Sequence, residues 1–199
     1  MRGRVGAGWY ALVFLLPPVV CLAAIALALC FVPGSDVSSL SLEKVRELPE
    51  RFLFIFLFIG LGEEPGWRGF ALPQLQTKFS PLSASLILAP IWALWHLPLI
   101  GNEFQGPIVV PFLLSVFGAT FMLTWVFNRT RESVLLPMLL HATVNTVGSG
   151  LIFPLFAGPT LVLLWWIYGA LWLGAGLGLL LFAAKKEARA ISAPRPLAA

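Results

Sequence analysis

The stretch FLFIFLFIGL, residues 52–61, carries no charge and leads through Gly62 into Glu63-Glu64-Pro65-Gly66-Trp67-Arg68. A run this apolar is typical of a helix inside a membrane. A charged residue near the centre of such a helix raises the free energy of insertion by about 2.5–3.5 kcal/mol. Two adjacent carboxylates in this place therefore indicate that the protein uses them. The alternative is that they mark the water-facing end of the helix.

The composition supports a membrane protein. Of the 199 residues, 59% are hydrophobic and only 11% are charged, and the mean hydropathy is +0.90. A soluble domain usually has about a quarter charged residues. The net charge of +4 comes without a basic stripe interleaved with aromatic residues, so we expect membrane lipids, and no nucleic acid, among the partners.

Apolar stretches long enough to cross a bilayer as helices, about 20 residues each, recur along the chain. They predict an all-α bundle of about six transmembrane helices, some of them kinked, in a single domain at 1–184. The expected spans are 9–33, 50–73, 81–99, 108–127, 133–148 and 160–184.

Turn and cap residues predict how several of these spans begin and bend. Ser41 is expected to cap a short surface helix, and Ser80 with Pro81 to start the third span. Pro17-Pro18 and Pro90 predict kinks, because proline removes a helix hydrogen bond. A break is expected at Pro65-Gly66. The basic segment 185–199 is predicted to be a disordered cytoplasmic tail.

The basic residues predict the orientation. With a cytoplasmic N-terminus, Lys44, Arg46 and Arg51 are the only Lys or Arg residues in outer segments, and Arg68 is counted with the inner loops. Cytoplasmic loops of membrane proteins carry the excess of Lys and Arg. We therefore expect an integral protein of the cell membrane with both termini in the cytoplasm.

The only two histidines, His96 and His141, lie within predicted spans, and Asn145 follows His141 by one helical turn. Each of these side chains could simply form a hydrogen bond between helices. Together with Glu63 and Glu64, however, they are predicted to converge on one cavity, because buried polar groups without partners are unfavourable by roughly 1–3 kcal/mol each. One difficulty is depth, since straight helices would place His96 nearer the outer end than His141.

These residues occur in the order and spacing of three known motifs. Glu63, Glu64 and Arg68 match Glu-Glu-x-x-x-Arg, and Gly69-Phe70 also fit. His96 follows an aromatic residue by four positions, although Trp92 stands where Phe is usual. His141 and Asn145 match His-x-x-x-Asn/Asp. The chain thus resembles the CPBP family, the CAAX-protease and bacteriocin-processing intramembrane proteases, with a core at about 47–150.

The resemblance implies an endopeptidase that cuts near the C-terminus of a hydrophobic or lipidated, membrane-associated substrate. Glu63 with His96 would activate a water molecule, and His141 with Asn145 would stabilise the oxyanion. Glu64 and Arg68 would order the Glu63 carboxylate. Because donors placed where negative charge develops lower the barrier, this division of roles is physically reasonable.

The cofactor is left open by the sequence. Glu63, His96 and His141 are a possible zinc set with an open position for water, which would make the protein a metalloprotease. A glutamate-activated water without metal fits the same residues and is slightly preferred.

Two other functions remain open. The carboxylates and histidines could form a relay in a proton-coupled transporter, although no inverted repeat is visible in the sequence. The chain could also be a catalytically silent scaffold or immunity protein, against which the intact motifs argue.

Overall fold

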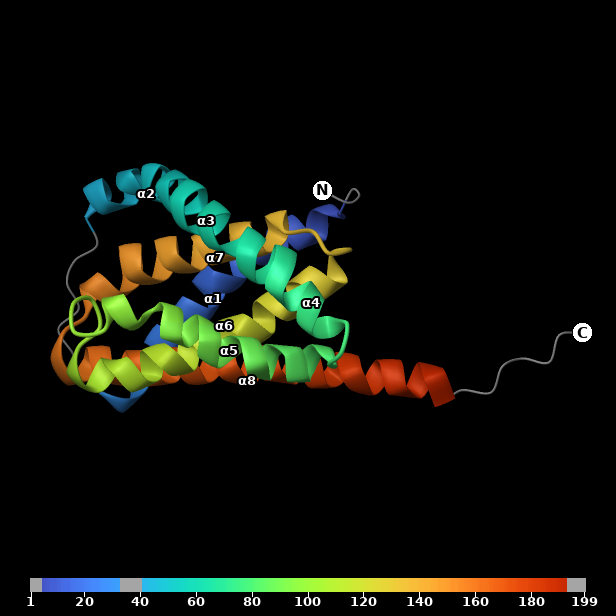
Figure 1. The fold of residues 1–199 in the computed structure, drawn as a ribbon. Helices are drawn as coiled ribbons and strands as arrows, with labels where there is room; N and C mark the ends of the chain where they lie inside the picture. The colour runs from blue at the N-terminus through green and yellow to red at the C-terminus, as the bar shows by residue number, and fades with distance from the viewer. Residues whose placement is uncertain (1–4, 33–40, 193–199) are drawn as a thin grey trace, which may run out of the picture.

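The computed structural model describes residues 5–32 and 41–192, with side chains as far as residue 186. These residues form a bundle of helices without a β-strand in the described ranges, as predicted (Figure 1). The α-helices are α1 (Ala7–Phe31), α2 (Leu42–Ile55), α3 (Leu61–Gly66), α4 (Leu72–Gln76), α5 (Pro81–Trp95), α6 (Val109–Arg129), α7 (Leu135–Val147) and α8 (Gly158–Ser192).

Helices α2, α3 and α4 form one continuous helical stretch. Two π-helical turns, Phe56–Gly60 and Trp67–Ala71, join the three segments. The predictions of a separate surface helix and of a break at Pro65-Gly66 were therefore wrong. The wider π-helical turn accommodates an extra residue without ending the helix, and such turns are frequent at functional sites. The Ser41 cap is present, since its hydroxyl accepts a hydrogen bond from the Lys44 N–H at 3.2 Å.

Five helical segments of the described chain are long and apolar enough to cross a membrane: 7–31, 81–99, 106–129, 135–155 and 158–186. The remaining predicted span, 50–73, lies in the α2–α4 stretch, which carries Glu63, Glu64 and Arg68. The protein is therefore a polytopic helical membrane protein, and the predicted span that is not among these five segments is the one that carries the charged motif.

Several segment ends differ from the predictions. Helix α8 continues to Ser192, so 185–192 is helical where a disordered tail was expected; 193–199 lie outside the described residues. Residues 150–155, which lie between the predicted fifth and sixth spans, are helical, because a π-helical turn and a 3-10 turn continue α7 to Leu155. Helix α5 begins at Pro81, and the Ser80 hydroxyl accepts from the Ser83 N–H at 3.2 Å, as predicted.

Small residues bring α6 and α8 into close contact. A Cβ atom added to Gly118 would lie 2.3 Å from the backbone N of Leu173, and one added to Gly176 would lie 2.5 Å from the Gly118 carbonyl oxygen. Helices within membranes associate through such small residues, because lipid supplies no hydrophobic driving force between them. The α6–α8 pair thus forms a tightly packed base for the bundle.

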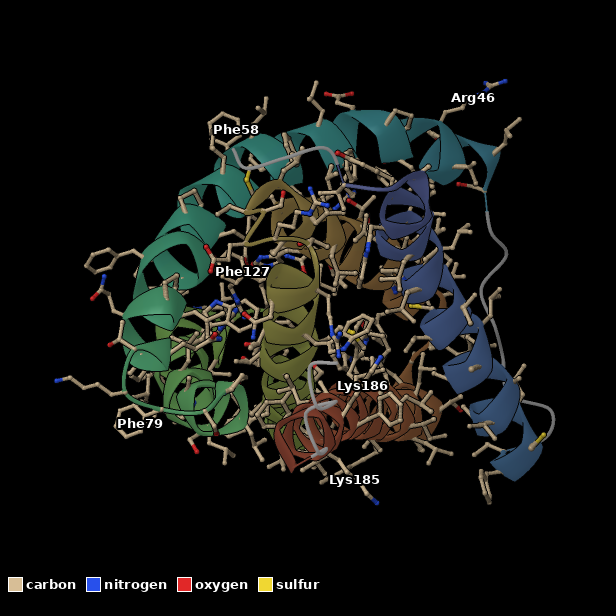
Figure 2. All side chains as sticks on the ribbon, turned by 90° about the vertical axis from the view of Figure 1, so that its right-hand side faces the viewer. Arg46, Phe58, Phe79, Phe127, Lys185 and Lys186 are labelled. Carbon is tan, nitrogen blue, oxygen red and sulfur yellow. The ribbon has the colours of Figure 1, made fainter. Side chains whose placement is uncertain are left out.

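Apolar side chains also cover the outside of the bundle. Phe58 and Phe79 point away from it, with 68% and 45% of their surface exposed, whereas Phe127 lies inside at 3% (Figure 2). Lys185 and Lys186 lie near the end of α8. An apolar exterior with charges towards helix ends is what a surrounding bilayer requires.

Candidate active site

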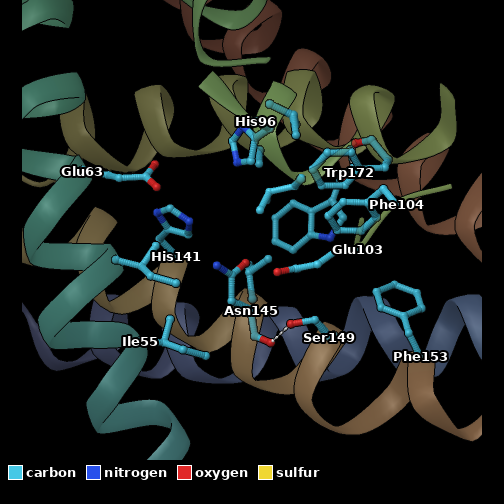
Figure 3. A pocket seen from close by; sticks show the side chains of 18 of the residues that line it. Ile55, Glu63, His96, Glu103, Phe104, His141, Asn145, Ser149, Phe153 and Trp172 are labelled. Atoms are coloured by element: carbon cyan, nitrogen blue, oxygen red, sulfur yellow. Dashed lines mark hydrogen bonds between the residues drawn. The ribbon is translucent and has the colours of Figure 1, made fainter. Parts of the chain in front are cut away.

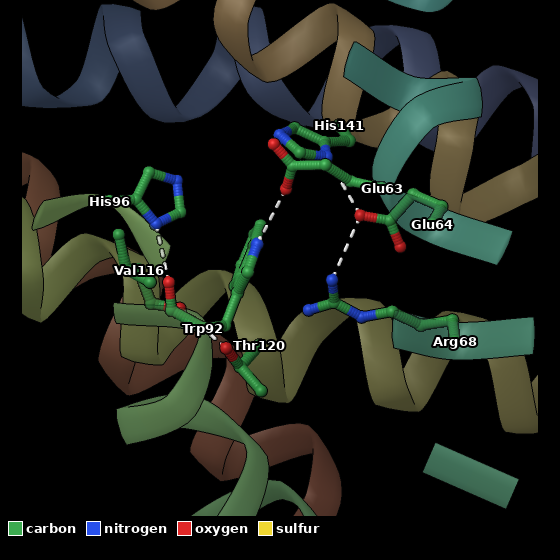
Figure 4. Close-up of polar contacts among 8 residues, drawn as sticks. All are labelled: Glu63, Glu64, Arg68, Trp92, His96, Val116, Thr120 and His141. Atoms are coloured by element: carbon green, nitrogen blue, oxygen red, sulfur yellow. Dashed lines mark hydrogen bonds and ion pairs between the residues drawn. The ribbon is translucent and has the colours of Figure 1, made fainter. Parts of the chain in front are cut away.

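Glu64 is the centre of a buried polar cluster between α3 and α7. Its Oε1 atom accepts a hydrogen bond from Arg68 Nη1 at 3.0 Å and lies 2.8 Å from His141 Nδ1 (Figure 4). Glu64 and Arg68 are fully buried, and His141 is 5% exposed. The pairing compensates two charges that would otherwise be strongly destabilising away from water.

Arg68 also lies against an aromatic ring. Its Cζ atom is 4.2 Å from the centroid of the Trp92 ring, a cation–π contact. Its Nε and Nη2 atoms, like Glu64 Oε2, find no hydrogen-bond partner within the described residues. Arg68 is thus an interior residue, and counting it as a cation of an inner loop was wrong.

Glu63 faces the other way and meets α5. The Trp92 indole N–H donates a hydrogen bond of 2.8 Å to Glu63 Oε2. One turn later, His96 Nδ1 lies 2.7 Å from the Trp92 carbonyl oxygen. Glu63 and His96 are both partly exposed, so water can reach them.

The hydrogen bonds fix the tautomers of both histidines. A carbonyl oxygen and a carboxylate can only accept, so Nδ1 of His96 and Nδ1 of His141 must each carry the proton. In the neutral ring, Nε2 then has a free lone pair. Both imidazoles can consequently act as bases or ligands through Nε2, or donate from Nε2 as imidazolium.

The structure brings Glu63, His96, His141 and Asn145 to the wall of one cavity of about 960 Å³ (Figure 3). Glu64 and Arg68 are not among the lining residues. The Asn145 side chain points into the cavity, and its carboxamide makes no hydrogen bond to any described residue. Four of the six candidate residues can therefore meet a bound molecule, and the other two lie behind the wall.

The expected mismatch in depth between the two histidines does not keep them apart. Both imidazoles pack edge-on against the Trp92 ring, with centroid distances of 5.3 Å for His96 and 5.4 Å for His141. The end of α5 and the middle of α7 thus meet at the Trp92 side chain.

The family resemblance implies that Glu64 and Arg68 order the Glu63 carboxylate, but neither residue forms a hydrogen bond with Glu63 among the described residues. In the described structure both residues contact each other, and Glu64 contacts His141 instead of Glu63. The Glu63 carboxylate is held by Trp92. The helix rotates by about 100° per residue, so the two adjacent glutamates face different neighbours.

The residues do not form a metal site in this arrangement. Among the described residues, no three His, Cys, Asp or Glu side chains are grouped closely enough to hold a metal ion. Glu63, His96 and His141 share the cavity wall, and both imidazoles contact the Trp92 ring. The donor set is chemically suitable for zinc, whereas its spacing is not.

Sequence reasoning missed several residues of the cavity. Glu50, Arg51 and Glu103 line its exposed mouth, and Glu103 points inward (Figure 3). One signal was available, since Glu103 is the only charged residue in the 101–107 loop. The aromatic far wall, which includes Phe153 and Trp172, could not be distinguished from ordinary core residues.

Comparisons with known proteins agree with the motifs. Residues 47–147 match the family model of Rce1-like type II CAAX prenyl endopeptidases. The chain is 33% identical over 145 residues to the CAAX prenyl protease 2 of Methanococcus maripaludis, an alignment that covers 67% of this chain and 53% of that protein. The chain thus spans about half the length of this curated relative. On this evidence, the chain belongs to the family of Rce1-like type II CAAX prenyl endopeptidases.

Proposed function

We propose that the protein is an intramembrane endopeptidase that hydrolyses a peptide bond near the C-terminus of a lipidated or otherwise membrane-associated substrate. The observation that carries the proposal is the shared cavity wall of Glu63, His96, His141 and Asn145. Family membership supports the reaction class. The apolar exterior of the bundle supports a substrate that arrives through or along the membrane.

Glu63 acts as the general base of this proposal. One of its oxygens is held by the Trp92 N–H, and the other takes a proton from a water molecule in the cavity. The hydroxide attacks the carbonyl carbon of the peptide, and the C–N bond breaks after the proton is passed to the leaving amine. His96 Nε2 lies on the same wall and assists in moving this proton.

Asn145 and His141 stabilise the negative charge that develops on the carbonyl oxygen. The Asn145 carboxamide makes no other hydrogen bond within the described chain and offers its N–H₂ group. His141 can donate from Nε2 when it is an imidazolium, and its Nδ1 lies 2.8 Å from the Glu64 carboxylate. Donors fixed in advance at the position of the oxyanion lower the barrier to hydrolysis.

The proposed mechanism contains no metal step, because the donor spacing does not fit a metal ion. The test is peptide hydrolysis by purified protein in detergent, with metal content measured after dialysis against a chelator. Full turnover at negligible metal content supports the metal-free mechanism. Loss of turnover that returns on adding zinc alone would overturn it.

The substrate enters at the end of the cavity that Glu50 and Glu103 line. This end lies on the side of α2, away from the start of α1 at Ala7 and the described end of α8 (Figure 1). If both termini are cytoplasmic in the cell membrane, as the charge distribution favours, the mouth faces the opposite side. A cysteine at Gln105, in a Cys21→Ser/Cys30→Ser background, should then react with a membrane-impermeant maleimide on intact cells. Reaction only after lysis would reverse this orientation.

The decisive experiment measures cleavage of a lipidated peptide by wild-type protein and by the Glu63→Gln, His96→Ala and His141→Ala variants. We expect each variant to lose activity while remaining folded. If wild-type protein shows no cleavage but moves protons across liposomes in a manner that depends on Glu63, the transporter alternative replaces the protease. If it shows neither cleavage nor proton movement, the catalytically silent scaffold replaces the protease as the proposed function.

A further inference from the structure

We propose that Trp92 is the positioning residue that holds Glu63 in the orientation needed to activate water. This inference rests on the proposed function of Glu63. Trp92 lies on α5, it is only 3% exposed, and its side chain contacts residues from α3, the following π-helical turn and α7.

The indole N–H distinguishes the two oxygens of the Glu63 carboxylate. It donates to Oε2 at 2.8 Å, while Oε1 accepts no hydrogen bond from the described residues. A carboxylate with one oxygen fixed cannot rotate freely. The remaining oxygen is thereby directed to the cavity, where it can accept a proton from water.

The backbone of Trp92 also positions His96, which assists Glu63 in the proposed mechanism. Its carbonyl oxygen accepts the Nδ1–H of His96 at 2.7 Å, which leaves His96 Nε2 unprotonated. One residue therefore sets the orientation of the base through its side chain and the tautomer of the neighbouring histidine through its main chain.

The indole itself is held on two sides. The Arg68 guanidinium lies 4.2 Å from its ring centroid, and the His141 ring meets it edge-on at 5.4 Å. Arg68 is in turn paired with the buried Glu64. The buried cluster thus acts on Glu63 through Trp92, without touching it.

Tryptophan at position 92 matters because phenylalanine, which is usual at this position in the CPBP family, has no hydrogen-bond donor in its side chain. A Trp92→Phe variant keeps an aromatic face for Arg68 and keeps the backbone carbonyl for His96. It removes only the N–H and part of the ring. This substitution therefore separates the proposed role from general aromatic packing.

The first test is steady-state peptide hydrolysis by the Trp92→Phe variant. Loss of a hydrogen bond to a charged group should lower kcat by about 10- to 100-fold, with KM unchanged because the substrate does not bind to this N–H. Trp166→Phe, on the exposed side of α8 and outside the cavity, is the matched control and should retain wild-type kcat. An unchanged kcat in Trp92→Phe, or a rise in KM alone, would overturn the proposal.

The second test needs neither activity nor a stable Trp92 variant. Protein labelled with ¹⁵N at the indole nitrogens should show the Trp92 N–H resonance at a position typical of a strong hydrogen bond. In Glu63→Ala this resonance should move upfield, while the resonance of Trp166 stays in place. A Trp92 resonance that does not respond to Glu63→Ala refutes the inference. A response in a protein without any peptidase activity would refute the proposed function and keep the contact.

Discussion

Glu63 and Glu64 are adjacent in the chain but lie in two different regions of the molecule. Glu64 is fully buried, and one of its oxygens is shared by Arg68 and His141. Glu63 is partly exposed on the cavity wall and receives one hydrogen bond, from Trp92. Residue type therefore does not determine the role. The surroundings decide that one carboxylate is structural and that the other can react.

The two regions should respond differently to mutation. Removing a group from the buried cluster leaves an opposite charge without compensation, so the effect falls on folding. Removing a group from the cavity wall leaves its neighbours in contact with water, so the effect falls on turnover. The following predictions, from the largest expected effect to the smallest, test this contrast.

Glu63→Gln should reduce turnover of a lipidated peptide by about 10²- to 10⁴-fold, the usual contribution of a general base. The amide has nearly the same shape as the carboxylate, so the thermal unfolding temperature should stay near that of the wild-type protein. Peptide hydrolysis and thermal unfolding in detergent are the two measurements. Retained turnover, or a large loss of stability, would place Glu63 with the buried region instead.

Arg68→Ala should lower the free energy of unfolding by about 3–5 kcal/mol, because the Glu64 carboxylate is left buried without its cation. The matched double variant Arg68→Ala/Glu64→Gln removes both charges and should recover part of this loss. Denaturant unfolding of the wild-type protein, the Arg68→Ala and Glu64→Gln single variants and the double variant measures the coupling. Additive effects of the two substitutions would mean that the pair does not act as a unit.

Asn145→Ala should lower kcat by about 10²- to 10³-fold, as expected for the loss of one oxyanion donor. Stability should change little, because the carboxamide makes no hydrogen bond within the described residues. Asn128→Ala, at the far end of α6 and outside the cavity, is the control and should keep wild-type kcat. Equal activity in both variants would remove Asn145 from the site.

Gly118→Ala should destabilise the protein by about 1–3 kcal/mol, since the new methyl group overpacks the contact between α6 and α8. Gly174→Ala is the matched control, because an added Cβ there meets no atom within 4 Å. The activity per folded molecule should be unchanged in both variants. A selective fall in kcat for Gly118→Ala would show that helix packing also tunes the cavity, and would weaken the contrast between the regions.

Much of the fold followed from local chemistry. Helical spans, the caps at Ser41 and Ser80 and the apolar exterior each depend on residues close together in sequence, which hydropathy and cap rules describe well. The continuous helix through Pro65 was not predictable in this way. The π-helical turns before and after α3 depend on what the neighbouring helices contact, and single-sequence rules contain no such information.

The candidate site, like the fold, was predictable from the sequence only in part. The sequence by itself determined which groups had to be brought together, because two histidines, two glutamates and an asparagine in membrane spans are unfavourable without partners. Only the tertiary structure decided the pairs: Glu64 with His141 and Arg68, and Glu63 with Trp92. The reason is geometric, since the rotation of one helix against its neighbours fixes which of two identical side chains meets which partner.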